Sequence, residues 1–301
     1  MQTLEQYVAR VWPAIAESVS LSTRASYDRA LRLRVLPTLG SLPIDKVGVA
    51  EVEKAYYAWS GAPSTRQDAL AILSRVMKRA VRDGYALANP VPSIEKPRRS
   101  VVVPMPRALT PDEVEELFVF VPDWYHAFIG LMLYAGLRFG EASGLTWEDV
   151  DISRGLLKVT RQLDRTGNLA PTKSGRPRVV PIRAELEELL LAHARLTGCV
   201  EGLVCTTESG AGIHASNFAR AIRWRAIRDR IRPGLRFHDL RHHCATTFLA
   251  EGHPMNAVQA WLGHSNVAVT SRYVVSGERE AINALTRLNP ARVKRTAGTA
   301  K

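Results

Sequence analysis

The chain has 301 residues, of which 46% are hydrophobic, so it is longer than one hydrophobic core usually supports and we expect two domains. Lys and Arg outnumber Asp and Glu by 41 to 29, and the resulting formal net charge of +12 favours a polyanionic partner, most simply a nucleic acid. Three cysteines without a C-x-x-C pair argue against a disulfide framework and a zinc knuckle, and are typical of a reducing cytoplasm.

The start of the chain has the features of neither a signal peptide nor a membrane span, because Glu5 and Arg10 lie within it and no long apolar run occurs. Residues 1–88 contain no alternating strand pattern. We therefore predict that the first domain is all-α.

One helix of this domain is predicted to begin after Ser22 or Thr23, which are good N-cap residues, and to end before Pro37. Two more are predicted over about 49–59 and 64–83, the latter with a regular apolar stripe. The opposite face of this last helix is basic and forms either a solvated surface or a contact with DNA. Its candidate DNA-binding residues are Arg75, Lys78, Arg79 and Arg82.

A proline-rich basic segment follows at 89–107 and has no helical period. Because proline removes backbone donors and stiffens the chain, we predict an extended interdomain linker, in which Arg98 and Arg99 are further candidate DNA contacts. The predicted boundaries are thus 1–88 for a core-type DNA-binding domain and 108–301 for a second domain. Both halves of the chain are net basic, so both are expected to contact the same polyanion.

The second domain begins with a clear helix signal, in which Thr110 is the N-cap, Pro111 occupies the first turn and Glu113 completes a capping box. A second, strongly apolar helix over about 124–135 is expected to end at Gly136. The start of this domain is therefore predicted to be helical.

Two strand-like stretches, 155–160 and 177–182, flank the polar, turn-rich segment 164–176 and predict a small antiparallel sheet. Arg176 in that segment is a candidate DNA contact. The remaining periodic stretches predict helices over about 183–196, 214–230, 238–251 and 254–262.

His238 and Arg241 are three residues apart near the start of a predicted helix, so both side chains can reach one anion. A guanidinium matches two oxygens of a phosphate, and an imidazole beside it can move a proton near neutral pH. The alternatives are a capping histidine beside a surface arginine, or a metal site through His238 and His242. The metal site is disfavoured because no glutamate follows the first histidine and no third ligand is near in the pattern.

Two further groups of residues have ordinary interpretations when each is taken alone. Arg138 follows a glycine turn, and Glu141 three residues later could orient it, but such a pair is usually a surface ion pair. Tyr273 lies nine residues after His264, which follows the helix-ending Gly263. A single tyrosine is usually a core or surface residue, so it indicates chemistry only together with partners.

Four segments, in their order and spacing, resemble the tyrosine recombinase family of phage integrases and Xer-type recombinases: AGLRFGEASGLTWEDVD, TKSGRPRVVPI, HDLRHHCATTFLAEG and WLGHSNVAVTSRYV. The resemblance covers 108 to about 275 closely, and the first domain only as a helical core-binding domain. It implies a mainly α catalytic domain with a small antiparallel sheet. It also implies that Arg138 and Arg241 clamp the scissile phosphate, Lys173 protonates the leaving 5′ oxygen, His238 assists proton transfer, His264 binds a phosphate oxygen, Glu141 supports the site, and Tyr273 is the nucleophile.

These residue types suit phosphodiester chemistry on general grounds. Attack by a phenol oxygen builds negative charge on the non-bridging oxygens, which guanidinium and imidazole groups stabilise without a metal. Tyrosine keeps its proton at neutral pH, so a neighbouring base or cationic field must help to remove it. A 3′-phosphotyrosine bond retains the energy of the broken bond, which fits the absence of an ATP-binding G-x-x-x-x-G-K-[ST] loop. We therefore expect no metal and no cofactor.

The predicted function is site-specific recombination of double-stranded DNA by a homotetramer on two duplexes, as in family members, with no membrane involved. A phage-type integrase lacking an arm-binding domain is favoured over a Xer-type resolvase. A type IB topoisomerase and a non-catalytic DNA-binding regulator remain alternatives from other classes. The regulator is disfavoured because all six catalytic positions are present. Apolar residues at helical spacing over 281–288 predict a tail helix that docks on a neighbour or packs within its own chain.

Overall fold

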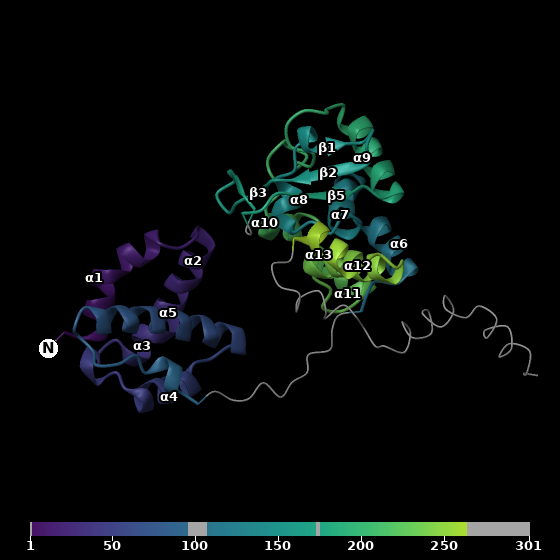
Figure 1. The fold of residues 1–301 in the computed structure, drawn as a ribbon. Helices are drawn as coiled ribbons and strands as arrows, with labels where there is room; N and C mark the ends of the chain where they lie inside the picture. The colour runs from purple at the N-terminus through teal and green to yellow at the C-terminus, as the bar shows by residue number, and fades with distance from the viewer. Residues whose placement is uncertain (1, 96–106, 173–174, 264–301) are drawn as a thin grey trace, which may run out of the picture. The chain divides into compact units, whose positions relative to one another are not determined.

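The computed structural model describes residues 2–95, 107–172 and 175–263. The chain divides into two compact units, Met1–Val102 and Val103–Lys301 (Figure 1). Each unit has its own hydrophobic core. Among the described residues, no helix is long and apolar enough to cross a membrane.

The described part of the first unit is helical, as predicted. Its longest helix, α5, buries the apolar stripe expected from the sequence and contacts both α2 and η1. The elements in chain order are α1 (Leu4–Glu17), α2 (Leu21–Ala30), the π-helical turn η1 (Leu31–Val35), α3 (Leu36–Leu39), the 3-10 turn η2 (Ile44–Lys46), α4 (Val49–Ala58), α5 (Pro63–Arg82) and the 3-10 turn η3 (Val91–Ser93).

The helix expected between Ser22 or Thr23 and Pro37 begins earlier and ends later. Ser20 is its N-cap, since the Ser20 hydroxyl accepts a hydrogen bond from the Thr23 N–H at 3.3 Å. Helical backbone runs on from α2 through η1 into α3 and ends at Leu39. Both predicted ends of this helix were therefore wrong.

A π-helical turn carries this helix past Pro37, which has no N–H to donate. In η1 the Leu36 N–H donates to the Leu31 carbonyl five residues earlier, as in a π-helix. The Thr38 hydroxyl donates to the Arg34 carbonyl at 2.7 Å, so a side chain satisfies a backbone acceptor three residues before the proline. The sequence rule that proline ends a helix fails here because local hydrogen bonds are rearranged.

The first unit extends past the predicted boundary at residue 88. Val91 and Ile94 are 5% and 6% exposed and belong to its core. The segment from 89 to 95 therefore packs on this unit instead of forming part of an extended linker. Most of the predicted linker, with Arg98 and Arg99, lies outside the described residues.

The described part of the second unit is mainly helical, as predicted. The helix α7 is its most buried element and contacts both α9 and α12. The helices and helical turns are α6 (Pro111–Phe120), η4 (Asp123–Tyr125), α7 (His126–Leu133), α8 (Phe139–Ser143), η5 (Trp147–Asp149), α9 (Ala184–Thr197), α10 (Ala215–Ala221), α11 (Trp224–Ile231), α12 (Phe237–Ala250) and α13 (Met255–Leu262).

An antiparallel sheet of the predicted kind joins β1 (Val150–Asp151), β2 (Leu156–Val159) and β5 (Arg178–Pro181) in the order β1-β2-β5. Its register places Leu157 opposite Val180, and both side chains are buried. The strands β2 and β5 lie within the two stretches that the alternating pattern indicated. The pairing of β5 in this sheet positions its first residue, Arg178, which is part of the candidate site described below.

A second hairpin was not expected from the sequence. It pairs β3 (Arg161–Leu163) with β4 (Leu169–Pro171) and so occupies part of the segment 164–176, which we interpreted as a turn. The Asp164 carboxylate closes the hairpin by accepting the Asn168 N–H at 3.0 Å. Strands of three residues are too short to show an alternating pattern, which explains why they were missed.

The single helix expected over 214–230 is broken into α10 and α11 at Arg223. Arg223 has a φ of 52°, the one positive φ of a non-glycine residue in the described chain. Phe218 and Trp224 are six residues apart and would lie on different faces of a continuous helix. The break allows both rings to pack on Phe237, with ring centroids 5.5 and 4.3 Å away.

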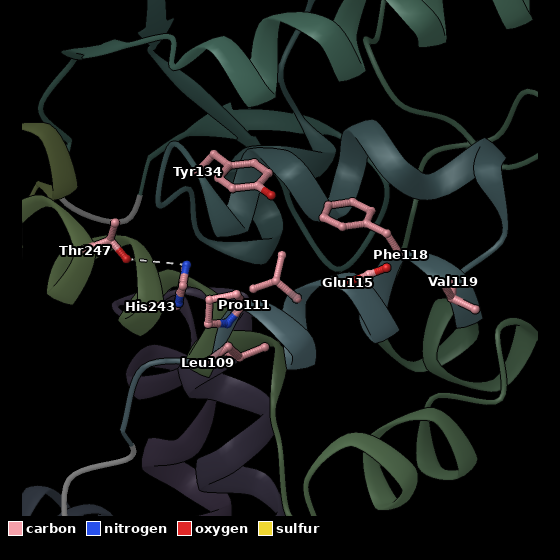
Figure 2. A pocket seen from close by; sticks show the side chains of 9 residues that line it. Leu109, Pro111, Glu115, Phe118, Val119, Tyr134, His243 and Thr247 are labelled. Atoms are coloured by element: carbon pink, nitrogen blue, oxygen red, sulfur yellow. Dashed lines mark hydrogen bonds between the residues drawn. The ribbon is translucent and has the colours of Figure 1, made fainter.

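An apolar groove of about 750 Å³ lies beside α6 and is lined also by Tyr134, which follows α7, and by residues of α12 (Figure 2). Figure 2 shows Tyr134, His243 and Thr247 on its wall, with the His243 ring near the Thr247 hydroxyl at 3.4 Å. Of the predicted catalytic residues that the structure describes, Arg138, His238 and Arg241, none lines this groove.

Candidate active site

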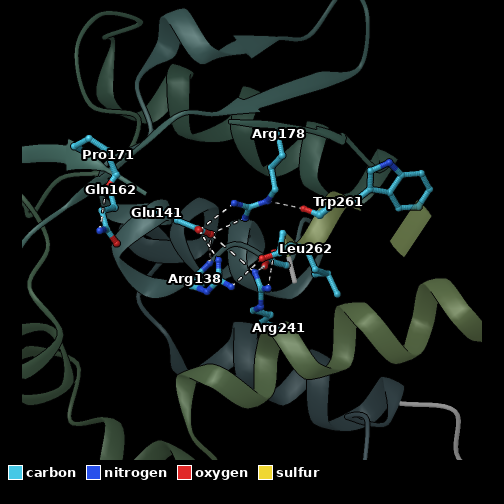
Figure 3. A network of polar contacts seen from close by, with 10 residues as sticks. Arg138, Glu141, Gln162, Pro171, Arg178, Arg241, Trp261 and Leu262 are labelled. Atoms are coloured by element: carbon cyan, nitrogen blue, oxygen red, sulfur yellow. Dashed lines mark hydrogen bonds and ion pairs between the residues drawn. The ribbon is translucent and has the colours of Figure 1, made fainter. Parts of the chain in front are cut away.

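A buried carboxylate organises the candidate site. Glu141 is 1% exposed and lies in α8, within reach of guanidinium groups from three separate segments (Figure 3). Two of these, Arg138 and Arg241, were predicted from the sequence, whereas Arg178 was not. Figure 3 shows the three guanidinium groups gathered around the Glu141 carboxylate.

Arg138 precedes α8 and is held by Glu141 in two ways. Its backbone N–H donates to Glu141 Oε2 at 2.8 Å, and its Nη1 donates to Oε1 at 2.8 Å. Its Nη2 reaches the Gly263 carbonyl at 3.2 Å. The Arg138 side chain remains 30% exposed, so this guanidinium is anchored on one side and open to solvent on the other.

Arg241 lies in α12 and is among the largest fully buried side chains. Its Nη1 donates to the Gly136 carbonyl and its Nη2 to the Leu262 carbonyl, both at 2.5 Å. Its Nη1 is also 3.9 Å from Glu141 Oε2. Gly136 has a φ of 64°, and an added side chain there would collide with Leu262, so this glycine permits the turn that presents its carbonyl.

Arg178 opens β5 and is 9% exposed. Its Nη1 and Nη2 donate to Glu141 Oε1 and Oε2 at 3.0 and 2.6 Å, which is the bidentate geometry of a strong ion pair. Its Nε donates to the Trp261 carbonyl at 2.6 Å. One signal could have revealed this residue: Arg178 shares the inward face of its strand with Val180, and a buried arginine requires an acidic partner.

Three consecutive carbonyls at the carboxyl end of α13, the last two of the helix and that of its cap Gly263, each accept a hydrogen bond from a different arginine. Trp261 accepts from Arg178, Leu262 from Arg241, and Gly263 from Arg138. Such carbonyls have no partner within the helix, and positive groups near them are favoured by the helix dipole. Gly263 has a φ of 66° and ends α13, as predicted.

His238 lies in the first turn of α12, three residues before Arg241, as expected. Although the residue is exposed, partial removal from water, followed by the positive charge of Arg241, lowers the pKa of His238 below its ordinary value of 6.5. The imidazole is therefore mostly neutral at pH 7 and able to accept a proton. The ring of His242 lies 6.5 Å from that of His238 between centroids.

Glu141 is ionised throughout the physiological pH range. Burial alone would raise the pKa of this carboxyl, but hydrogen bonds and the positive charge of Arg178, with those of Arg138, outweigh that effect and lower the pKa from 4.5 to about 2. Because folding lowers this pKa, the ionised Glu141 carboxylate stabilises the folded state above pH 4.5. This stabilisation is lost as the pH falls toward 2.

The Glu141→Gln variant should therefore be less stable than the wild type at pH 7, by roughly 3 to 5 kcal/mol for a broken buried ion pair. The difference should shrink between pH 4.5 and 2, because the wild-type carboxylate becomes protonated there. Urea unfolding at several pH values measures it. Glu251→Gln is the control, since its pair with Arg183 is partly exposed, and it should show little effect. An equal loss in both variants would contradict the buried-pair interpretation.

Three of the predicted catalytic residues, Lys173, His264 and Tyr273, lie outside the described residues. Their proposed roles therefore stay predictions. Arg176, a candidate DNA contact, is exposed just before β5.

The basic face of α5 is largely exposed. Arg75, Lys78 and Arg82 are exposed, and Arg79 is half-buried. Arg79 and Arg82 each lie within 4 Å of the Asp83 carboxylate, at 3.8 and 3.5 Å, so part of their charge is already paired. This face fits either of the two interpretations made from the sequence.

Replacing all four of these residues by alanine tests the two interpretations. If the face binds DNA, the slope of log affinity against log salt concentration should decrease by roughly one unit for each lost phosphate contact. Fluorescence anisotropy with a DNA duplex over a range of salt concentrations measures the slope. A variant that changes the three arginines to lysine retains the charge and should keep the slope. An unchanged slope in the alanine variant would assign this face to solvent.

Comparison with known proteins covers nearly the whole chain. The model of the phage integrase family matches residues 107–280, and that of the phage integrase central domain matches residues 5–96. The integrase of Mycobacterium phage D29 is 28% identical over 285 residues, covering 90% of this chain and 74% of the relative. A tyrosine recombinase of Pseudothermotoga lettingae is 30% identical over 205 residues, covering 66% of each chain.

Solved structures show the same fold. The Tn1549 transposon integrase, solved with transposon right end DNA, superimposes with a TM-score of 0.76 at 20% identity and covers 96% of this chain and 100% of that chain. A lambda integrase dimer bound to a COC′ core site gives a TM-score of 0.72 at 18% identity, covering 92% and 97%. Together with the family match over more than half of the chain, these findings show that the protein belongs to the phage integrase family of tyrosine recombinases, which are site-specific DNA recombinases.

Proposed function

We propose that this recombinase is a phage-type integrase that cuts and rejoins DNA through a covalent 3′-phosphotyrosine bond at Tyr273. The observation that carries the proposal is the cluster of Arg138 and Arg241 around buried Glu141, at the end of α13. The chain continues from this end directly to His264. The cluster therefore lies where the nucleophile segment begins.

The geometry of the cluster is suited to binding a phosphodiester. A carboxylate orients Arg138, whose guanidinium is partly exposed, and an oriented cation stabilises the charge of a pentavalent phosphate better than a mobile one does. His238 has a lowered pKa, so in its neutral form it can take the proton of the attacking hydroxyl. We assign proton donation to the leaving 5′ oxygen to Lys173, and hydrogen bonding to a non-bridging oxygen to His264, on the basis of the sequence motifs.

We infer that the DNA substrate is a duplex and that the active assembly is a homotetramer. The Tn1549 integrase is described in complex with transposon end DNA, and lambda integrase as a tetramer bound to a Holliday junction, with a TM-score of 0.71 at 17% identity. The net charge of +12 supports binding of a polyanion. A cytoplasmic location, in a bacterium or a phage-infected cell, follows from this proposal because the substrate is found there.

Covalent trapping tests the proposed function. The protein is incubated with a library of nicked duplexes that cannot be resealed after cleavage, and the DNA attached to protein is recovered under denaturing conditions and sequenced. We expect adducts at one defined sequence, joined through the 3′ phosphate. Adducts at unrelated sequences, together with relaxation of supercoiled DNA, would favour a type IB topoisomerase. Binding without any adduct would favour a non-catalytic regulator.

The choice between an integrase and a Xer-type resolvase depends on the pair of sites that recombine. Integrases of Mycobacterium phages L5 and FRAT1 are each 28% identical to this chain and cover 92% and 90% of it, which supports the integrase. XerC of Alcanivorax borkumensis is 24% identical over 91% of this chain. Recombination between two different sites that share only a short core supports the integrase. Recombination only between two copies of the same site contradicts it.

A further inference from the structure

Arg178 holds two parts of the candidate site at once, although the proposed chemistry assigns it no role. Its side chain is 6% exposed, so water cannot compete for its donors. Two of its nitrogens bind both oxygens of Glu141, and the third binds the Trp261 carbonyl at 2.6 Å. The strand β5 is thereby joined to α8 and to the end of α13 by one guanidinium.

The Glu141 carboxylate is shared among three cations, and Arg178 forms the shortest ion pair with it. The closest nitrogen-to-oxygen distances are 2.6 Å for Arg178, 2.8 Å for Arg138 and 3.9 Å for Arg241. Without Arg178, the charge of Glu141 would be balanced by the other two arginines alone. Both would then be held more tightly by the protein and be less available to a phosphate.

We propose that Arg178 is a positioning residue for DNA cleavage: it neutralises Glu141 so that Arg138 and Arg241 can act on the phosphate, and it fixes the end of α13 from which the chain leads to His264. This inference rests on the proposed function of Arg138 and Arg241. Arg178 itself contacts no reacting atom, because its donors are directed at Glu141 and Trp261.

An arginine is required for this role. The planar guanidinium offers donors in two directions, and here two donors face the carboxylate while Nε faces the helix end. A lysine carries the same charge at a single point and cannot hold the two oxygens and the carbonyl in this arrangement. Arg178→Lys therefore separates geometry from charge.

The test compares Arg178→Lys and Arg178→Met with Arg183→Lys and Arg183→Met. Arg183 lies just after β5 and also holds a carboxylate with short contacts, to Glu251 at 2.7 Å, but away from the cluster. For each protein we measure DNA affinity, the melting temperature, and the rate of covalent adduct formation at saturating DNA. The rate is measured well below the melting temperature of the weakest variant that folds.

We expect DNA affinity within about threefold of the wild type, and cleavage rates reduced roughly tenfold for Arg178→Lys and a hundredfold for Arg178→Met, as is common when a group that orients catalytic residues is lost. The Arg183 variants should cleave at the wild-type rate. If Arg178→Met does not fold, Arg178→Lys decides. A folded Arg178→Lys protein that cleaves at the wild-type rate, or that loses only DNA affinity, would overturn the proposal by showing a merely structural role.

A double variant tests the route through Glu141. If Arg178 acts by neutralising this carboxylate, the Arg178→Met, Glu141→Gln protein should cleave faster than the product of the two single losses predicts. Multiplication of the two single losses would contradict that route. The proposed function fails in a different way, since the wild type itself would then form no adduct.

Discussion

The Tyr273→Phe protein should fold, bind its DNA site and form no covalent adduct with it. Phenylalanine keeps the ring and its packing but lacks the oxygen that attacks the phosphate, so only the chemical step is removed. The measurement is denaturing electrophoresis of protein incubated with a nicked site, followed by peptide mapping of the wild-type adduct. This variant should show the largest effect of all, because no other group replaces a missing nucleophile.

Six of the seven other tyrosines of the chain serve as controls. Burial raises the pKa of the Tyr125 and Tyr134 hydroxyls, and burial with the Asp83 carboxylate raises that of Tyr7 to about 12, so these groups lose a proton less readily than usual. Phenylalanine at the control positions should leave adduct formation largely intact. These control positions are Tyr27, Tyr56, Tyr57, Tyr85, Tyr125 and Tyr134. Undiminished cleavage by Tyr273→Phe, or an adduct on another residue, would overturn the assigned mechanism.

Lys173→Ala should bind DNA nearly as well as the wild type but cleave it at least a hundredfold more slowly, within the range for loss of a general acid. The leaving 5′ oxygen needs a proton as its bond to phosphorus breaks. A substrate with sulfur in place of that oxygen needs little protonation, because a thiolate is a much better leaving group. Sulfur substitution should therefore restore cleavage by Lys173→Ala, which single-turnover kinetics would show.

A second lysine provides the matched control. Lys158 is exposed on β2, opposite Val179 of β5, so Lys158→Ala removes an exposed positive charge to which the proposed chemistry assigns no role. It should cleave both substrates at the wild-type rates. If sulfur gives no rescue of Lys173→Ala, Lys173 binds the phosphate or supports the structure instead of donating the proton.

The positions of most helices could be predicted because their ends carry local signals. Thr110 and Glu113 form the expected capping box, with hydrogen bonds of 3.2 and 2.8 Å, and Gly263 ends α13 in the left-handed conformation. In such cases the residues that stop a helix lie within one turn of its end. Periodicity placed Arg241 in a helix, as α12 confirms, whereas the short helix α8 after Arg138 was not predicted.

The errors lie where distant contacts decide the structure. No glycine or proline marks the break at Arg223, which depends on packing of Phe218 and Trp224 against Phe237. The sequence did not predict a role for Arg178 because that role depends on contact with Glu141, 37 residues away in the chain. A sequence pattern in one segment does not identify a contact partner in another segment. It can show only that an inward-facing charged side chain requires a partner of opposite charge.

The π-helical turn at Leu31–Val35 also affects how related sequences should be aligned. A π-helical turn contains one residue more than the α-helical turn that would replace it. A relative with a regular α-helix here can therefore be one residue shorter without moving the elements on either side. Deleting one residue within α2 would instead rotate the preceding part by about 100°, given 3.6 residues per turn, and move its apolar face away from the core. A one-residue gap in an alignment is therefore best placed within this turn.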